Sequence, residues 1–380
     1  MTLTESSGAD RATTAVRLRT GVIGSGLIAQ AMHLHHLAEL PELFDVAAIC
    51  DLSDSTATAA ADRHGISRVV TDWHELLDAD LDAVLVLTGG DHAAIAIGAA
   101  RAGLHVFVEK PMCFSVEEGL AMVDAARSAG TTMMVAYNKR YDPAYERFVE
   151  AAHALDDARF LRVTTLESPI APYVQHYPLV PSIAPADDVL QGIRHEQETA
   201  IDAALGDADP ALRSVYQGVL LDTLVHELNA VRGILGEPTR LDYADLRMDH
   251  VSVMLHFGEL PVAIHWIDLP GIARYRMEFA LYAPDRRITL AFPSPFLRNE
   301  PAVLHLEGGT PGPPSAFESH EVISYDSSFK RELIAFHRNV VERTEPITSA
   351  ADAVRDIALC QAIVACHRTG RPIEEPTRLD

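Results

Sequence analysis

The stretch GVIGSGLIA, residues 21–29, decides how the first half of the chain folds. It begins inside an apolar run typical of a buried strand and leads into residues that favour a helix. Gly24, Gly26 and Ala29 fit the pattern G-x-G-x-x-G/A, which provides a tight turn, access of a pyrophosphate to the backbone, and close packing of helix on strand. Strand, turn and helix together predict a dinucleotide-binding unit, although the motif by itself also fits a tight turn without ligand.

Strands and helices alternate from this stretch to about residue 140. Further strands are predicted at four apolar runs: 46–50, 84–87, 105–108 and 132–136. Nearly continuous Val, Ile and Leu is typical of parallel strands that helices cover on both faces. We therefore predict an α/β fold, an N-terminal Rossmann domain with a doubly wound parallel sheet over residues 17–140, after a disordered tail over residues 1–16.

Beyond residue 140 the pattern changes to hairpins. Alternating strands with tight turns are predicted at 251–257, 263–268, 276–282 and 287–292. Residues 168–200 are rich in proline and polar side chains, and we interpret them as a long loop that serves as a lid or an oligomer arm. We predict a C-terminal α+β domain with an open, mostly antiparallel sheet over residues 141–372, which binds substrate and forms the oligomer. Its last helix is expected to pack near the Rossmann domain.

Composition excludes several classes of protein. Lys and Arg number 31 and Asp and Glu 54, so the net charge is −23, and phosphate backbones and anionic membranes would repel the chain. No apolar run approaches the ~18 residues that span a bilayer, and the N-terminus lacks the apolar core of a signal peptide. The four cysteines form no C-x-x-C pair and are expected to be buried free thiols. We expect a cytoplasmic protein that binds neither nucleic acid nor membrane.

An acidic residue, Asp51, ends the second predicted strand. At this place a carboxylate accepts hydrogen bonds from the adenosine ribose of NAD and repels the 2′-phosphate of NADP. Asp51 lies 27 residues beyond Gly24, further than the usual ~20, and a longer first helix and loop would absorb the difference. Since no arginine follows at once, NAD is favoured over NADP. A helix N-cap is the alternative role for Asp51.

Two further features suit proton and hydride chemistry. Lys110, in the sequence EKP, follows a predicted parallel strand, and ligands bind at the carboxyl ends of such strands. Asp222 and His226 are four residues apart on a predicted helix, so their side chains are expected to meet. A carboxylate beside an imidazole fixes its tautomer and raises its basicity, as a general base for an alcohol proton requires. The alternatives are a solvated surface lysine and an ordinary surface pair.

The chain resembles the glucose–fructose oxidoreductase / inositol dehydrogenase / MocA (Gfo/Idh/MocA) family. The matching stretches lie between residues 18 and 372 and are GVIGSGLIA, Asp51, TGGDHAAIAIGAARAGLHVFVEKP, YNKRYDPAY, DTLVH and the terminal helix ADAVRDIALCQAIVACHRTGRPI. The resemblance implies a nicotinamide cofactor, sugar or cyclitol substrates, and a homodimer or homotetramer built on the C-terminal sheet. It also implies that Lys110, Asp222 and His226 are catalytic.

The resemblance extends the expected site. Cofactor contacts are predicted for Gly24, Gly26, Leu27, Ile28, Asp51, Thr88, His92, Glu109, Lys110 and Asn138. Substrate contacts are predicted for Arg140, Tyr141, Tyr173 and His176. The turn TGGDH is one residue shorter than the commoner turn of the family, which bears on Thr88. No metal site is expected, because the spacings of His33, His35 and His36 point them around a helix rather than to one place.

These observations predict an NAD-dependent oxidoreductase. It would transfer a hydride between nicotinamide and a secondary alcohol or ketone of a sugar, amino-sugar or cyclitol. His226 would take the hydroxyl proton, Asp222 would orient His226, and Lys110 would donate to the reacting oxygen. Two alternatives stay open: a glycosidase that reduces bound NAD transiently, and a non-catalytic NAD-binding sensor or scaffold. The presence of all three residues argues against the sensor.

Overall fold

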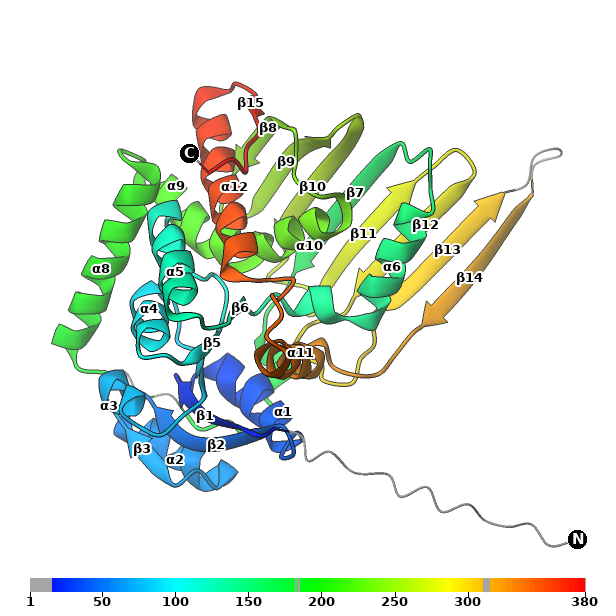
Figure 1. The fold of residues 1–380 in the computed structure, drawn as a ribbon. Coiled ribbons are helices and arrows are strands. Elements are labelled where there is room, and N and C mark those ends of the chain that lie inside the picture. Colours follow the sequence, from blue (N-terminus) through cyan, green and yellow to red (C-terminus); the bar gives the residue numbers. More distant parts are fainter. Residues whose placement is uncertain (1–15, 182, 184, 310–314, 380) are drawn as a thin grey trace, which may run out of the picture.

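The computed structural model describes residues 16–181, 183, 185–309 and 315–379, so all but Val16 of the predicted tail lies outside the described residues. Two sheets with helices around them make up this part of the chain (Figure 1). The boundaries proposed for the two domains remain predictions.

The first sheet has the doubly wound parallel form that the sequence predicts. Within the described residues its six strands run in the order β3-β2-β1-β4-β5-β6, and every pair is parallel. The strands are β1 (Leu18–Ile23), β2 (Phe44–Cys50), β3 (Arg68–Val70), β4 (Ala83–Val86), β5 (His105–Val108) and β6 (Met133–Val135). The order reverses between β1 and β4, and ligands of such sheets bind at the carboxyl ends of the strands beside this point.

Helices cover both faces of this sheet. They are η1 (Ala29–His33), α1 (Leu34–Ala38), α2 (Asp54–His64), α3 (Trp73–Leu77), α4 (Ala93–Arg101) and α5 (Val116–Ala129), η1 being a π-helical turn. Ser115 caps α5 through a reciprocal capping box with Glu118, as its position predicts. Gly65 ends α2 in the left-handed conformation, with φ of 69°.

The second sheet is mixed but mostly antiparallel, which also agrees with the prediction. Its order is β14-β13-β12-β11-β7-β10-β9-β8-β15, and β7 and β10 are its parallel pair among the described residues. The strands are β7 (Phe160–Glu167), β8 (Arg240–Leu246), β9 (His250–Phe257), β10 (Leu260–Asp268), β11 (Arg276–Tyr282), β12 (Arg286–Phe292), β13 (Val303–Gly309), β14 (Ala316–Val322) and β15 (Ile373–Glu374).

The remaining helices join the two sheets. They are η2 (Asn138–Tyr141), α6 (Pro143–His153), α7 (Ala171–Val174), α8 (Asp187–Leu205), α9 (Pro210–Val215), η3 (Tyr216–Leu224), α10 (Val225–Leu235), α11 (Ser328–Glu342) and α12 (Ala350–Thr369). Figure 1 shows α6, α10 and α12 on one face of the second sheet. Helix α12 packs on β8 and α10 and also on α5 of the Rossmann part. It therefore connects the two sheets.

The interpretation of residues 168–200 as a loop was wrong, because α7 and most of α8 fall within them. Apolar periodicity is weak in α8. Its buried positions are confined to the C-terminal end, at Ala200, Ile201 and Leu205. The rest of the helix is largely exposed and polar, so the pattern resembles that of a loop.

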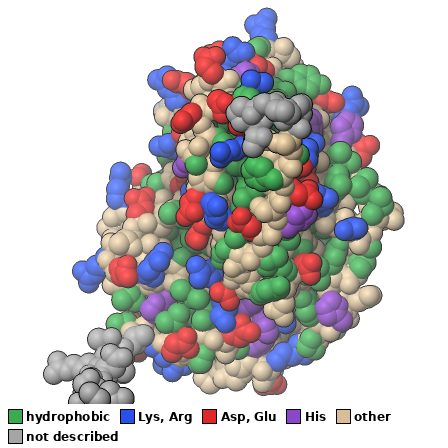
Figure 2. Space-filling view, turned by 90° about the vertical axis from the view of Figure 1, so that its right-hand side faces the viewer, with side chains coloured by type: hydrophobic (Ala, Val, Ile, Leu, Met, Phe, Trp, Pro, Cys, Tyr) green, Lys and Arg blue, Asp and Glu red, His purple; other side chains and the backbone are tan. Residues whose placement is uncertain are grey.

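The cysteines have the state that the sequence predicts. All four cysteines are free and buried. Among the described residues, every helix is too short or too polar to traverse a lipid bilayer. On the face in Figure 2, acidic and basic side chains are interspersed, so the negative net charge is not gathered there as one patch.

Candidate active site

The turn after β1 has the geometry that its glycines predict. Gly24 has φ of 97°, and a Cβ there would lie 2.7 Å from the backbone of Leu87 and Thr88. Only glycine fits this place, because the turn lies against the end of β4. At Gly26, apart from the neighbouring residues of the turn and its helix, no described residue has an atom within 4 Å of the Cβ position. The backbone of the turn is therefore open to a large group such as a pyrophosphate.

Asp51 connects this turn to the start of α2. Its Oδ2 accepts hydrogen bonds from the backbone N and the Oγ of Ser25, at 2.8 and 2.7 Å, and its Oδ1 accepts from the N of Ser53 at 2.9 Å. Ser53, not Asp51, is the N-cap of α2. The N-cap alternative for Asp51 is therefore excluded, and the carboxylate lies where the turn and the second strand meet.

Thr88 and His92 belong to the short turn after β4. The Oγ1 of Thr88 is buried and has no hydrogen-bond partner among the described residues. The ring of His92 lies between two carbonyl oxygens, with Nε2 2.8 Å from Thr88 O and Nδ1 2.7 Å from Pro111 O. Burial lowers the pKa of His92. His92 braces the turn against the EKP segment, and the Thr88 hydroxyl is left for a ligand.

Glu109 is held by a histidine that the sequence did not single out for this role. The Nε2 of His33 lies 2.7 Å from Glu109 Oε1, and the N of Lys110 donates to Oε2 at 3.0 Å. Burial opposes ionisation, but the hydrogen bond from His33 and the neighbouring positive charges outweigh it, so the pKa of Glu109 lies below its ordinary value. Glu109 is therefore an ionised carboxylate fixed at the carboxyl end of β5.

Lys110 meets Asp222 across the boundary between the two sheets. Its Nζ donates to Asp222 Oδ1 at 3.0 Å and to the Asp222 carbonyl oxygen at 2.5 Å. The two residues are 112 positions apart in the chain. The contact joins the edge of the Rossmann sheet to η3.

The expectation that Asp222 meets His226 was wrong. No hydrogen bond or ion pair among the described residues joins them, because the Asp222 carboxylate pairs with Lys110 instead. Asp222 lies in the π-helical η3, whereas His226 lies in α10, so the regular α-helical spacing that predicts the contact is not kept.

The environment of His226 lowers its basicity rather than raising it. Its Nδ1 is buried without a partner among the described residues, and its ring lies edge-on to Tyr137. Burial, followed by the charges of Lys139 and Lys110, holds the pKa of His226 well below its ordinary value. The imidazole is therefore neutral at neutral pH and free to accept a proton.

Two buried charged residues beside His226 were missed. Lys139 and Glu227 are 5% and 0% exposed. Burial lowers the pKa of Lys139 to about 8, against the attraction of Glu227. Burial also raises the pKa of Glu227 to about 7, and its carboxylate accepts a hydrogen bond from Thr165. A sequence offers little signal for them, since most lysines and glutamates lie on the surface.

Three of the residues predicted to contact cofactor or substrate, Asn138, Arg140 and Tyr141, form hydrogen bonds or ion pairs within the chain. Asn138 Nδ2 donates to Ser328 Oγ at 2.8 Å, Arg140 pairs with Asp352 at 3.3 Å, and Tyr141 OH lies 2.8 Å from Thr348 Oγ1. These contacts tie η2 to α11 and to the start of α12.

The other two predicted substrate contacts, Tyr173 and His176, lie on the segment that follows β7. Tyr173 OH accepts from the N of Tyr275 at 2.6 Å and lies 3.2 Å from Ser168 Oγ. His176 lines a separate hollow of about 560 Å³ together with His35 and Glu39. The structure thus brings Lys110 and Asp222 together but gives His176 different neighbours.

Comparison with known proteins assigns the chain to a family. Residues 18–137 match the family model GFO_IDH_MocA, described as an oxidoreductase family with an NAD-binding Rossmann fold. Over 351 residues the chain is 24% identical to myo-inositol 2-dehydrogenase of Thermotoga maritima. This match covers 88% of this chain and 92% of that protein. The matched part of the chain, residues 18–137, belongs to the Gfo/Idh/MocA oxidoreductase family.

Other relatives match over shorter parts. The uncharacterized oxidoreductase YrbE of Bacillus subtilis is 35% identical over 130 residues, 34% of this chain and 38% of that one. For inositol 2-dehydrogenase of Salmonella typhimurium, the chain spans 52% of the relative's length. A levoglucosan dehydrogenase, solved in complex with NADH and levoglucosan, superposes with a TM-score of 0.73 at 21% identity over 95% of this chain and 100% of that chain. That likeness shows the shared fold.

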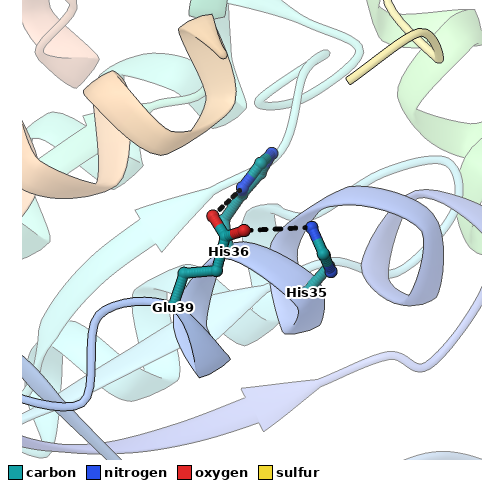
Figure 3. Close-up of side chains that lie close together, drawn as sticks. All are labelled: His35, His36 and Glu39. Carbon is teal, nitrogen blue, oxygen red and sulfur yellow. Dashed lines mark hydrogen bonds and ion pairs between the residues drawn. The ribbon is translucent and has the colours of Figure 1, made fainter. Parts of the chain in front are cut away.

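A histidine cluster at the start of the Rossmann part differs from the expected arrangement. His35 and His36 both converge on Glu39, at 3.4 and 3.1 Å, and the ligand atoms of the three residues lie within 4.8 Å of one another (Figure 3). The expectation that the histidines point apart holds for His33 but was wrong for this pair. The Nζ of Lys330 lies 3.3 Å from Glu39 Oε2 and would compete with a metal cation for that carboxylate.

Proposed function

We propose that this Gfo/Idh/MocA protein catalyses NAD-dependent oxidation of a secondary alcohol, or reduction of the matching ketone, on a sugar, amino-sugar or cyclitol. The observation that carries the proposal is the Lys110–Asp222 pair at the carboxyl edge of the Rossmann sheet, with a neutral His226 in the next helix. The names of the relatives, myo-inositol 2-dehydrogenase and levoglucosan dehydrogenase, support the substrate class.

The cofactor would lie along the carboxyl edge between β1 and β4. The open backbone at Gly26 fits the pyrophosphate, and the unpartnered Thr88 Oγ1 offers a hydrogen bond. Leu27 and Ile28 would flank the pyrophosphate, and Glu109, Lys110 and Asn138 would hold the nicotinamide half. When bound, NAD supplies the hydride acceptor.

The protein's own residues would move the proton and stabilise charge. His226 accepts the hydroxyl proton at Nε2, since Nδ1 is buried. Lys110 donates to the reacting oxygen and stabilises its developing negative charge. Asp222 holds the ammonium of Lys110 in place, a role that replaces the one expected from the sequence.

Asp51 would select NAD over NADP, because its carboxylate attracts ribose hydroxyls and repels a 2′-phosphate. We also propose a cytoplasmic homodimer or homotetramer that associates through the second sheet.

A substrate screen tests the function. Sugars, amino-sugars and cyclitols are mixed with NAD or NADP, and NADH formation is followed by absorbance, with Lys110→Met as the matched blank. Stoichiometric NADH from one class of polyol supports the proposal. Release of sugar from a glycoside without NADH would indicate the glycosidase instead. Cofactor binding without turnover of any candidate would favour a sensor.

A further inference from the structure

Residues 176–181 lie across the Rossmann part and are tied to the helix that follows the glycine turn. The N of Val180 donates to Gln30 Oε1 at 2.7 Å, and Gln30 Nε2 lies 3.1 Å from Val180 O. The same Nε2 donates to Ser25 O, inside the turn, at 2.7 Å. One buried side chain therefore holds both the crossing segment and the turn expected to bind pyrophosphate.

A second contact lies at the Asp51 corner. The N of Ile183 donates to Thr56 Oγ1 at 3.3 Å. Thr56 is buried in the first turn of α2, whose N-cap Ser53 donates its backbone N–H to Asp51. Val180 thus lies on the pyrophosphate side of the expected cofactor site, and Ile183 lies on its ribose side.

The segment is also fixed to the second domain through Tyr177. Its OH donates to Phe296 O at 2.5 Å, and the guanidinium of Arg298 lies 4.1 Å from the centre of its ring. Arg298 in turn donates to Ala31 O at 2.8 Å, next to Gln30. Tyr177 and Leu179 pack with an apolar cluster formed by Ile28, Ala31, Met32, Phe296 and Phe329. Both domains therefore hold the segment down.

Helix α8, which follows in the chain, reaches the turn after β4 on the same edge of the sheet. A Cβ at Gly90, in the turn after β4, would lie 2.1 Å from Gln197 Nε2 of α8. Helix α8 packs on α5 and α12, and Figure 1 shows it running along the side of the molecule toward the Rossmann part. Contacts at Gln30, Thr56 and Gly90 surround the edge, while no described residue beyond the turn and its helix has an atom within 4 Å of the Cβ position of Gly26.

We propose that residues 176–181 form a strap that completes the dinucleotide site and retains the cofactor. This inference rests on the proposed function. A dinucleotide seated on the glycine turn leaves only after the Gln30–Val180 hydrogen bonds and the Tyr177 packing have opened. The strap therefore adds a barrier that slows dissociation.

Dissociation of NADH tests the strap without requiring a substrate. Stopped-flow fluorescence measures the rate for the full-length wild type, for Gln30→Ala and for Tyr177→Ala. Tyr177→Ala loosens the strap but keeps the hydrogen bond from Gln30 to Ser25 O, so it separates strap opening from loss of that contact to the turn. Ser252→Ala is the matched control, since it removes one comparable hydrogen bond, between Ser252 Oγ and His265 Nδ1 at 3.0 Å, within the second sheet. We expect both strap variants to release NADH at least about ten-fold faster and the control to match the wild type.

Hydrogen exchange provides a second readout. The backbone amides of His176, Tyr177, Leu179 and Val180 should exchange more slowly in the NAD complex than in the free protein. The strap proposal alone would be overturned if all four proteins bind NADH tightly and release it at the same rate. It would also be overturned if NAD leaves the hydrogen exchange of the strap unchanged. Failure of the wild type to bind either NADH or NADPH in calorimetry would overturn the proposed function, and the strap's role with it.

Discussion

The ammonium of Lys110 lies 3.0 Å from the carboxylate of Asp222, although the two side chains come from opposite sides of the domain boundary. The second contact, from Nζ to the Asp222 carbonyl at 2.5 Å, fixes the lysine further. The ammonium that we propose as the donor to the substrate oxygen is therefore held in one orientation before substrate arrives. Preorganised donors of this kind stabilise a developing oxyanion without reorganisation during the reaction.

Lys110→Met should lower kcat by about 10²–10³-fold and leave NAD affinity nearly intact, because the variant removes one donor to the developing charge. Steady-state kinetics on the substrate found by the screen, with calorimetry for NAD, measure both effects. Asp222→Asn should cost less, and the two changes should be non-additive in a double-mutant cycle because they act on one contact. A Lys110→Met enzyme with wild-type kcat would remove Lys110 from the mechanism.

His226→Ala should lower kcat/KM for oxidation by about 10²–10⁴-fold through loss of the general base. Because burial and the charges of Lys139 and Lys110 hold the pKa of His226 well below 6.5, the limb of the wild-type pH profile that reports His226 should lie in acid. Lys139→Met removes one of these charges and should move that acid limb to higher pH. His74→Ala, an exposed histidine, is the control. A limb that stays in place in Lys139→Met would contradict this electrostatic account.

The fold could be predicted because its signals are local. Glycine spacing, the strand before it and the helix after it lie within one stretch, and continuous Val, Ile and Leu mark most parallel strands. Strand β3 was missed because it has only three residues. Strands β13 and β14 were missed because polar residues interrupt their apolar pattern. Helix α8 was missed because it buries so little.

The site could be predicted only where position in a strand or turn decides it. The position of Lys110 at the site could be predicted because it comes just after β5. Its contact with Asp222 could not, because that contact depends on the packing of residues 112 positions apart. The π-helical η3 breaks the spacing that suggested an Asp222–His226 pair. Lys139 and Glu227 have the composition of surface residues, and only the packing of η2 and α10 reveals that they are buried.

Glu227→Gln should stabilise the protein at pH 8 and have little effect at pH 5. The folded-state pKa of about 7 lies above the ordinary 4.5, so the folded protein binds the proton more tightly than the unfolded one. Stability therefore rises as pH falls from about 7 toward 4.5, and above 7 the buried charge costs at most about 3 kcal/mol. Urea unfolding at both pH values measures the difference, and Glu259→Gln, at an exposed position, is the control. Destabilisation by Glu227→Gln at pH 8 would mean that its attraction to Lys139 outweighs burial.

NAD should bind at least about ten-fold more tightly than NADP, with Asp51 as the reason. A hydrogen bond to a charged group contributes about 1.5–3 kcal/mol, and each 1.4 kcal/mol is a factor of ten in affinity. Asp51→Ala should weaken the binding of NAD, and it should strengthen the binding of NADP because the 2′-phosphate is no longer repelled. The difference in affinity between the two cofactors should therefore become smaller. The variant also frees the N–H and Oγ of Ser25, and Ser25→Ala separates that effect because it keeps the carboxylate.

Calorimetry with both cofactors on wild type, Asp51→Ala and Ser25→Ala decides between two roles for the carboxylate. If Asp51 recognises the ribose, Ser25→Ala keeps the preference for NAD and Asp51→Ala loses it. If Asp51 acts only by bracing the glycine turn through Ser25 and Ser53, Asp51→Ala weakens NAD and NADP by the same factor, since both share the pyrophosphate. Equal binding of the two cofactors by the wild type would contradict selection by Asp51 altogether.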